Sequence, residues 1–193
     1  MQPDKKLVGC ASRFIEGKGL REMVEAAAQV VSRYPEVAFV LAGSHDGDAP
    51  GIVADLQSRV RALHLENHVF IVDWWDDTPD LFASLDVFVH CPTTFLEGMG
   101  LANLEAMAMA KPTVVSNNGG LPEAVVDGVT GFVVPPGDVR QMAEAVLRLL
   151  NDEELARRYG LNGRRRVVRE FDIAKNVKQY EELFHEYALR LAS

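Results

Sequence analysis

The chain has 193 residues, 48% of them hydrophobic and 25% charged, which is the composition of a globular protein with a substantial core. Its formal net charge of −8 argues against a general nucleic-acid-binding protein, because no basic stripe offsets the acidic excess. The sequence shows no signal peptide and no long uncharged apolar segment, so we expect no transmembrane segment and a cytoplasmic location.

Apolar runs and amphipathic segments alternate along the chain. The apolar runs predict six strands, at residues 7–11, 37–42, 69–72, 87–89, 113–115 and 132–134. Helical spacing predicts helices at residues 20–33, 52–63, 79–84, in the stretch that ends at 110, from 122, and at 138–150, 153–170 and 173–191. Continuously apolar strands between helices are typical of a parallel sheet covered on both faces. The sequence therefore predicts an α/β fold: a three-layer Rossmann-like domain with a six-stranded parallel sheet.

Polar or glycine-containing loops follow the predicted strands. They occupy residues 13–19, 43–48, 73–75, 92–100 and 117–121. Parallel sheets of this kind bind ligands beyond the carboxyl ends of their strands. We therefore expect the five loops to converge on one edge of the sheet and to form a ligand site there.

The stretch from Thr94 to Ala110 carries the most chemical information. It turns through glycines into a helix that is apolar almost all round, and such a helix is normally buried. Glu97 and Glu105 should then be buried carboxylates, which need hydrogen-bond donors or a cation. No Lys or Arg lies between Glu97 and Ala110, so the donors come from elsewhere in the fold or from a ligand. Sugar hydroxyls are suitable donors.

The glycines of this stretch indicate a second kind of ligand group. Gly98 and Gly100 allow backbone N–H groups at a helix N-terminus to approach an anion such as a phosphate. Hydroxyl acceptors beside an anion-binding turn together predict a phosphorylated sugar or a nucleotide as the ligand.

Glu97 and Glu105, with seven residues between them and an EGxGL opening, resemble the E-x7-E motif of retaining glycosyltransferases with the GT-B fold. The closest group is glycosyltransferase family 4, whose members take sugars from nucleotide-sugar donors. The resemblance runs from about Leu7 to the C-terminus, in the order expected for the donor-binding domain. It implies that the chain is the C-terminal half of a GT-B fold.

The resemblance implies roles for the motif residues. Glu105 would bind the ribose hydroxyls, and Glu97 would contact the donor sugar near its anomeric carbon. The sugar and phosphate would be lined by the segment made of Gly98, Met99, Gly100 and Leu101. The residues alone leave two alternatives, in which Glu97 is simply exposed on a glycine turn and Glu105 caps a backbone group.

Arg13 and Lys18 flank a glycine-containing loop at the first strand–helix junction. Two cations beside a helix N-terminus would suit a diphosphate, although solvated loop charges are the better interpretation of an isolated Arg/Lys pair. Family members carry a GR…KG motif here, which implies that Arg13 and Lys18 bind the donor diphosphate and stabilise it as it leaves. Here Ser12 replaces the glycine, and the Arg-to-Lys spacing is one residue short. No metal or other cofactor is expected.

Further contacts to the nucleotide are implied by the resemblance alone. Gly43, followed by Ser44, ends the second predicted strand near the nucleotide, and the backbone of Val72, Asp73 and Trp74 would read the base. For Trp74 and its neighbour Trp75, core packing is as good an interpretation as base stacking.

Several other residues receive a plainer interpretation. Residues 117–123 resemble the GG-x-PE loop beside the donor pocket, where Glu123 is read as a helix-start charge. His90 is read as a satisfied core histidine, with a role in the site as the alternative, and the five histidines lack metal-ligand spacing. Cys10 and Cys91 are expected to be buried free thiols in a reducing compartment. The basic run of Arg164, Arg165 and Arg166 with Arg169 is read as a solvated helix face.

Members of this family have two domains, and the resemblance covers one. We therefore expect residues 1–193 to be a single nucleotide-sugar-binding domain that lacks its N-terminal acceptor domain, binds nucleotide and transfers poorly. Any contact with the inner membrane surface would come through that missing domain. The alternatives are a non-catalytic interaction module derived from such an enzyme and a GT-B nucleotide-sugar epimerase.

The last predicted helix, within residues 172–193, has an apolar stripe. The stripe consists of Val177, Tyr180, Phe184, Tyr187 and Leu191. In the family the terminal helix packs across the N-terminal domain. Without that domain, we expect the stripe to be exposed and to promote self-association.

Overall fold

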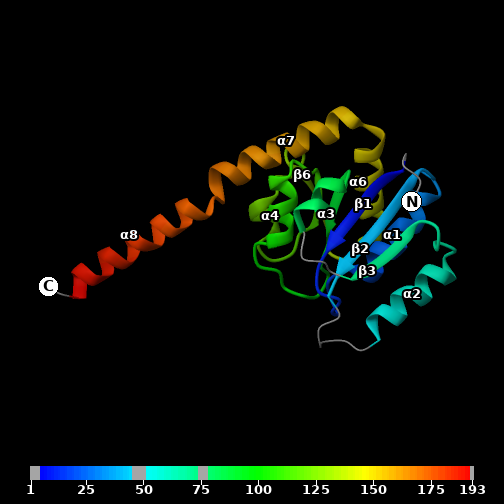
Figure 1. Cartoon of the computed structure of the whole chain (residues 1–193), viewed down its shortest axis with the longest axis horizontal. Helices are drawn as coiled ribbons and strands as arrows, with labels where there is room; N and C mark the ends of the chain where they lie inside the picture. Colours follow the sequence, from blue (N-terminus) through cyan, green and yellow to red (C-terminus); the bar gives the residue numbers. More distant parts are fainter. Residues whose placement is uncertain (1–4, 45–50, 74–77, 192–193) are drawn as a thin grey trace.

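Six parallel strands form one sheet in the computed structural model of the protein, which describes residues 5–44, 51–73 and 78–191. The strands are β1 (Lys6–Ala11), β2 (Val37–Gly43), β3 (Val69–Asp73), β4 (Val87–His90), β5 (Thr113–Ser116) and β6 (Gly131–Val134). They lie side by side in the order β3-β2-β1-β4-β5-β6 (Figure 1). The predicted α/β fold with a six-stranded parallel sheet is confirmed.

Helices follow the strands in the predicted alternation. They are α1 (Leu20–Val31), α2 (Ile52–Ala62), α3 (Thr78–Ser84), α4 (Leu101–Ala108), α5 (Leu121–Ala124), α6 (Val139–Asn151), α7 (Glu153–Glu170) and α8 (Ile173–Leu191). The side chain of Asp138 accepts a hydrogen bond from the backbone N–H of Gln141 and so caps α6, as predicted. α4 ends two residues before the predicted Ala110, whose φ of 57° is incompatible with a right-handed helix.

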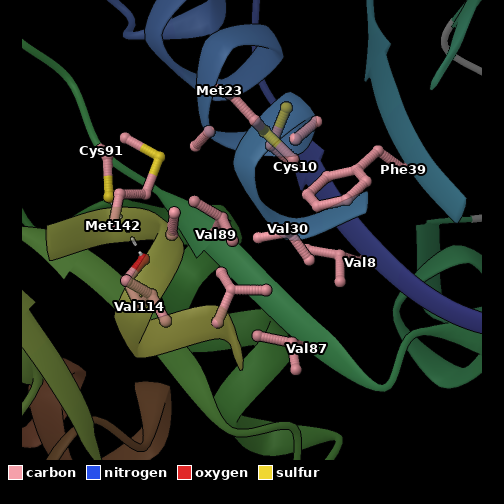
Figure 2. Packing of buried hydrophobic residues seen from close by; sticks show 14 of the residues in the cluster. Val8, Cys10, Met23, Val30, Phe39, Val87, Val89, Cys91, Val114 and Met142 are labelled. Atoms are coloured by element: carbon pink, nitrogen blue, oxygen red, sulfur yellow. Dashed lines mark hydrogen bonds between the residues drawn. The ribbon is translucent and has the colours of Figure 1, made fainter. Parts of the chain in front are cut away.

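The two faces of the sheet carry separate cores. On one face, side chains of alternate strand residues such as Val8 and Val89 pack with α1 and α6 (Figure 2). On the other face, Phe88 of β4 packs with α3, and Val115 of β5 packs with α4 and α5. The four inner strands β2, β1, β4 and β5 are therefore buried on both sides over most of their length, which explains their continuous apolar runs, whereas the edge strands β3 and β6 are only partly buried.

Helix α7 connects the two cores past the β6 edge of the sheet. Its first turns place Tyr159 in the core on the α1 and α6 face, and Val167 near its end packs with the core of α4 and α5. A Cβ atom at Gly160 would lie 1.9 Å from the carbonyl oxygen of Ala110, so only glycine permits this close crossing.

The basic residues of α7 are only partly a solvated face. Arg165 and Arg169 are exposed, as predicted. Arg164 also donates to the carbonyl oxygen of Ala108, and Arg166 to that of Ala124, at 2.6 and 2.9 Å. These cations therefore bind the carboxyl ends of α4 and α5, where helix dipoles favour positive charge.

Both cysteines are buried free thiols, as predicted. Cys10 lies on β1, and Cys91 directly follows β4 (Figure 2). Burial raises the pKa of the Cys10 thiol to about 12 and also raises that of Cys91. Both thiols are therefore in their unreactive protonated form at neutral pH.

Helix α8 extends away from the sheet and its covering helices (Figure 1). The stripe residues Val177, Tyr180, Phe184 and Tyr187 are all exposed, as predicted. Within the described ranges, no helix combines the length and apolar character needed to cross a bilayer.

Candidate functional site

The candidate site lies where the strand order changes direction. β1 and β4 are neighbours at the centre of the sheet, and the chain leaves them toward opposite edges. The loops after these two strands open a crevice at their carboxyl ends, the usual ligand position in doubly wound sheets. Of the five loops predicted to converge, residues 13–19, 92–100 and 117–121 meet here, and Ser44 of the loop after β2 also lies at the site.

Hydrogen bonds from backbone N–H groups hold the loop after β4 between two other loops. The N–H of Thr93 donates to the carbonyl oxygen of Gly17 at 2.7 Å, from the loop after β1. On the other side, the N–H of Glu97 donates to Oδ1 of Asn118 at 3.0 Å, and the N–H of Gly120 donates to the carbonyl oxygen of Glu97 at 3.1 Å. The backbone of Glu97 is thus fixed before any ligand is present.

Two glycines make this close assembly sterically feasible. Gly19 and Gly119 have φ angles of 77° and 55°, which residues with a Cβ atom rarely adopt. An added Cβ would lie 1.9 Å from the carbonyl oxygen of Cys91 at Gly19, and 1.8 Å from that of Glu97 at Gly119. The sequence therefore needs glycine at both positions for the three loops to touch.

Glu97 is the centre of a buried polar cluster. Its Oε2 atom lies 2.5 Å from Nζ of Lys18 and 3.0 Å from Nε2 of His90. The side chains of Glu97, Lys18 and His90 are only 14%, 8% and 5% exposed. Lys18 also lies over the ring of Phe95, 3.9 Å from its centroid.

The two donors determine the charge state of Glu97. Hydrogen bonds from His90 and then Lys18 lower the pKa of Glu97 from 4.5 to about 2, although burial opposes the shift. The donors do come from elsewhere in the fold, as predicted. The alternative of a carboxylate simply exposed on a glycine turn is wrong.

His90 is buried as predicted, but its ring also contacts Glu97. The alternative of a role in the site therefore describes His90 better than that of a core residue alone. The signal available in the sequence was its position at the end of an apolar run, just before the loop that carries Glu97.

Helix α4 is less buried than its composition predicts. Asn103, Ala106 and Met107 face the interior, but Leu101 is 74% exposed and Glu105 is exposed as well. The helix is covered by the sheet on one face and by α7, so part of its surface remains open. Neighbouring atoms still desolvate Glu105 enough to raise its pKa. Among the described residues, none donates a hydrogen bond to the Glu105 carboxylate or forms an ion pair with it, so the alternative in which Glu105 caps a backbone group gains no support.

A cavity of about 520 Å³ brings several of the predicted residues together. Its lining includes Arg13, Lys18, Glu97, Gly100 and Leu101, with Ser44 and His90 beside them. A larger groove of about 660 Å³ between β6 and α6 contains none of the predicted residues. The smaller cavity is the candidate site, because it contains the buried charged cluster.

The remaining predicted residues lie at or beyond the rim of this cavity. Gly43 ends β2, where a Cβ atom would lie 2.0 Å from the carbonyl oxygen of Ser12. Val72 and Asp73 end β3, which is separated from β1 by β2. Gly98 is exposed and Met99 is half-buried in the loop before α4. Trp74, with Trp75, lies outside the described residues.

The described part of the chain contains no cluster of His, Cys, Asp or Glu side chains able to hold a metal ion. The cations at the cavity are instead the side chains of Arg13 and Lys18. Such an arrangement can bind an anion at Arg13 and Lys18 and accept hydrogen bonds at Glu97.

Residues 1–166 match the family model of glycosyl transferases group 1, and the chain belongs to this family. It is 31% identical over 182 residues to N-acetyl-alpha-D-glucosaminyl L-malate synthase of Bacillus anthracis, covering 94% of this chain and 46% of the relative. It is 34% identical to alpha-maltose-1-phosphate synthase of Mycolicibacterium smegmatis, covering 95% and 48%. The chain spans about half the length of the curated relatives it matches.

Solved structures confirm that the fold is the C-terminal half of a GT-B fold. HepE of Anabaena, in a complex with UDP-glucose, superposes with a TM-score of 0.89 at 28% identity, over 95% of this chain and 49% of that one. The C-terminal domain of LpcC, a glycosyl transferase group 1 family protein of Francisella tularensis, gives 0.80 at 27% identity, over 89% and 88%.

The contact between residue 119 and Glu97 provides a test of the loop assembly. We expect Gly119→Ala to lower the free energy of unfolding by about 1–3 kcal/mol, because alanine is strained at a positive φ and its Cβ would clash with the carbonyl oxygen of Glu97. The control is Gly98→Ala, whose Cβ would meet nothing within 4 Å. Urea unfolding followed by circular dichroism measures both, and equal stability of the two variants would contradict the assembly.

The low pKa of Glu97 makes its contribution to stability depend on pH. Since folding lowers this pKa from 4.5 to about 2, the contribution is complete above pH 4.5 and is lost as the pH falls toward 2. The stability difference between wild type and Glu97→Gln should therefore shrink over that interval. Glu105→Gln is the control, because the raised pKa of Glu105 predicts a small change of opposite sign. Urea unfolding at a series of pH values measures both differences, and a pH-independent difference for Glu97→Gln would show that the carboxylate is not held ionised by folding.

Proposed function

We propose that this chain is the donor-binding domain of a glycosyltransferase that transfers a sugar from a nucleotide-diphosphate sugar to an acceptor with retention of configuration. The observation that supports this is the buried cluster of Lys18, Glu97 and His90 at the carboxyl ends of β1 and β4. It combines a cation suited to a phosphate with an ionised acceptor suited to a sugar hydroxyl. The HepE structure, which has the same fold, contains UDP-glucose.

The catalytic work falls to three residues in this proposal. Arg13 and Lys18 bind the diphosphate and stabilise the negative charge that develops on it as the sugar departs, so that no metal is required. Glu97 accepts a hydrogen bond from the donor sugar and orients it. All three line the same cavity, which supports their assignment to one substrate.

The other substrate contacts in this proposal come from α4, from the loop before it, and from the carboxyl ends of β2 and β3. Glu105, partly desolvated on α4, binds the ribose hydroxyls, and the backbone from Gly98 through Met99 and Gly100 to Leu101 lines the sugar and the phosphates. The nucleotide base lies near Gly43, Val72, Asp73 and Trp74. The first three of these end β2 and β3 at the same edge of the sheet as the cavity.

Transfer also requires an acceptor, and we assign it to a separate N-terminal domain. The curated relatives are about twice as long as this chain, which leaves room for such a domain. In its absence the isolated chain is expected to bind nucleotide but to transfer little sugar, because the acceptor is not positioned and the site does not close.

The exposed stripe of α8 supports a structural role for residues 172–193. We assign this helix to the interface with the N-terminal domain, and in the isolated chain the same stripe promotes self-association. Sedimentation velocity over a range of concentrations should show association of wild type. Phe184→Glu should weaken it, whereas Glu182→Ala on the opposite side of α8 should not. A wild-type chain that stays monomeric throughout would contradict the self-association.

Calorimetric titration of this chain with UDP, GDP and ADP tests the proposed donor site. We expect one nucleotide to bind, and Glu105→Ala to weaken it about tenfold or more, since hydrogen bonds to charged groups contribute about 1.5–3 kcal/mol. Glu66→Ala is the matched control, because this exposed carboxylate precedes β3 at the other edge of the sheet. Failure of all three nucleotides to bind would overturn the assignment of a donor site to this chain.

A further inference from the structure

One carboxylate oxygen serves two donors in the candidate site. Both Nζ of Lys18 and Nε2 of His90 lie within hydrogen-bond distance of Oε2 of Glu97. The proposed function, on which the present inference rests, gives Lys18 a second partner in the donor diphosphate. Lys18 cannot bind Glu97 and the diphosphate equally well at the same time, because its ammonium group is a compact charge that cannot be fully directed at both partners.

The two donors differ in how freely they can move. Lys18 lies in a loop on a flexible four-carbon stem, so its ammonium group can turn from Glu97 toward a phosphate. His90 is the last residue of β4, is 5% exposed, and is stacked on Phe88 with a centroid distance of 6.3 Å and an interplanar angle of 11°. A Cβ atom at Gly100 would lie only 3.5 Å from Cδ2 of His90, so the imidazole is enclosed on that side too.

A carboxylate that lost both donors would be unstable at this position. Glu97 is 14% exposed, and leaving a buried charge without a partner is strongly unfavourable. If Lys18 turned to the diphosphate and His90 were absent, Glu97 would take up a proton or swing toward solvent. Either change would remove the acceptor that the donor sugar needs.

We propose that His90 is a positioning residue that holds the carboxylate of Glu97 toward the donor sugar once Lys18 has turned to the diphosphate. His90 does this with the proton on Nε2, which the Nε2–H tautomer and the imidazolium form both carry. Oε2 then stays fixed on His90, and Oε1 accepts the hydrogen bond from a sugar hydroxyl. His90 therefore contributes to binding of the sugar moiety and little to binding of the diphosphate.

Three substitutions separate this role from simple packing. His90→Phe keeps a ring against Phe88 but removes the donor. His90→Gln keeps an N–H donor at about the reach of Nε2, and His90→Asn keeps the amide on a side chain too short to reach Glu97. Thermal unfolding of each variant shows whether it folds, and the Gln and Asn pair completes the test if the Phe variant does not.

The experiment titrates this chain with UDP, GDP and ADP and with the corresponding nucleotide-glucose compounds. In wild type the sugar should add affinity beyond that of the nucleotide that binds. In His90→Phe and His90→Asn, affinity for the nucleotide sugar should fall about tenfold while affinity for the nucleoside diphosphate changes less than about twofold. His90→Gln should restore most of the loss, and Glu97→Ala should add little to the loss in His90→Phe.

The outcomes distinguish this inference from the function on which it rests. An equal loss for nucleoside diphosphate and nucleotide sugar, an unchanged affinity for both, or a His90→Gln variant as weak as His90→Phe would each overturn the positioning role and leave the donor site intact. A wild-type chain that binds none of the six compounds would overturn the donor site, and the positioning role with it.

Discussion

The ion pair between Lys18 and Glu97 joins the two loops that leave the central strands of the sheet. It forms because β1 and β4 are neighbours, which brings residues 79 positions apart in the chain into contact. Both side chains are nearly buried, so removal of the Glu97 carboxylate would leave the Lys18 ammonium without its partner. The surrounding loop structure, including Gly19, Gly119 and the hydrogen bond from Glu97 to Asn118, fixes where these charges meet.

The fold was predictable from the sequence because local and global signals agree. Strands buried on both faces require continuous apolar runs, and all six runs became strands. The cap at Asp138 marked the start of α6 by the chemistry of one side chain. The burial of α4 was overestimated because alanine and leucine do not reveal how many sides of a helix are covered. Leu101 and Glu105 lie on the part of α4 that the described elements leave exposed.

The candidate site was predictable in its residue types but not in its contacts. The glycine turns, Arg13, Lys18 and the two glutamates were all recognisable from spacing and resemblance. The bond from His90 to Glu97 was not, because it depends on the register of β4 against the loop that follows it. The hydrogen bond from the N–H of Glu97 to Asn118 could not be predicted either, since it joins two loops whose bonded residues are 21 positions apart in the sequence.

The path of α7 past the sheet edge determines how the domain unfolds. One helix supplies Tyr159 to the core on one face and Val167 to the core on the other, so the two layers share a structural element. Loss of α7 would open both cores at once, which makes the two layers one cooperative unit. The match to the family model ends at residue 166, before Val167 and before Phe171, whose ring lies 5.6 Å from the guanidinium of Arg166. The cooperative unit therefore extends beyond the end of that match, through the last turn of α7.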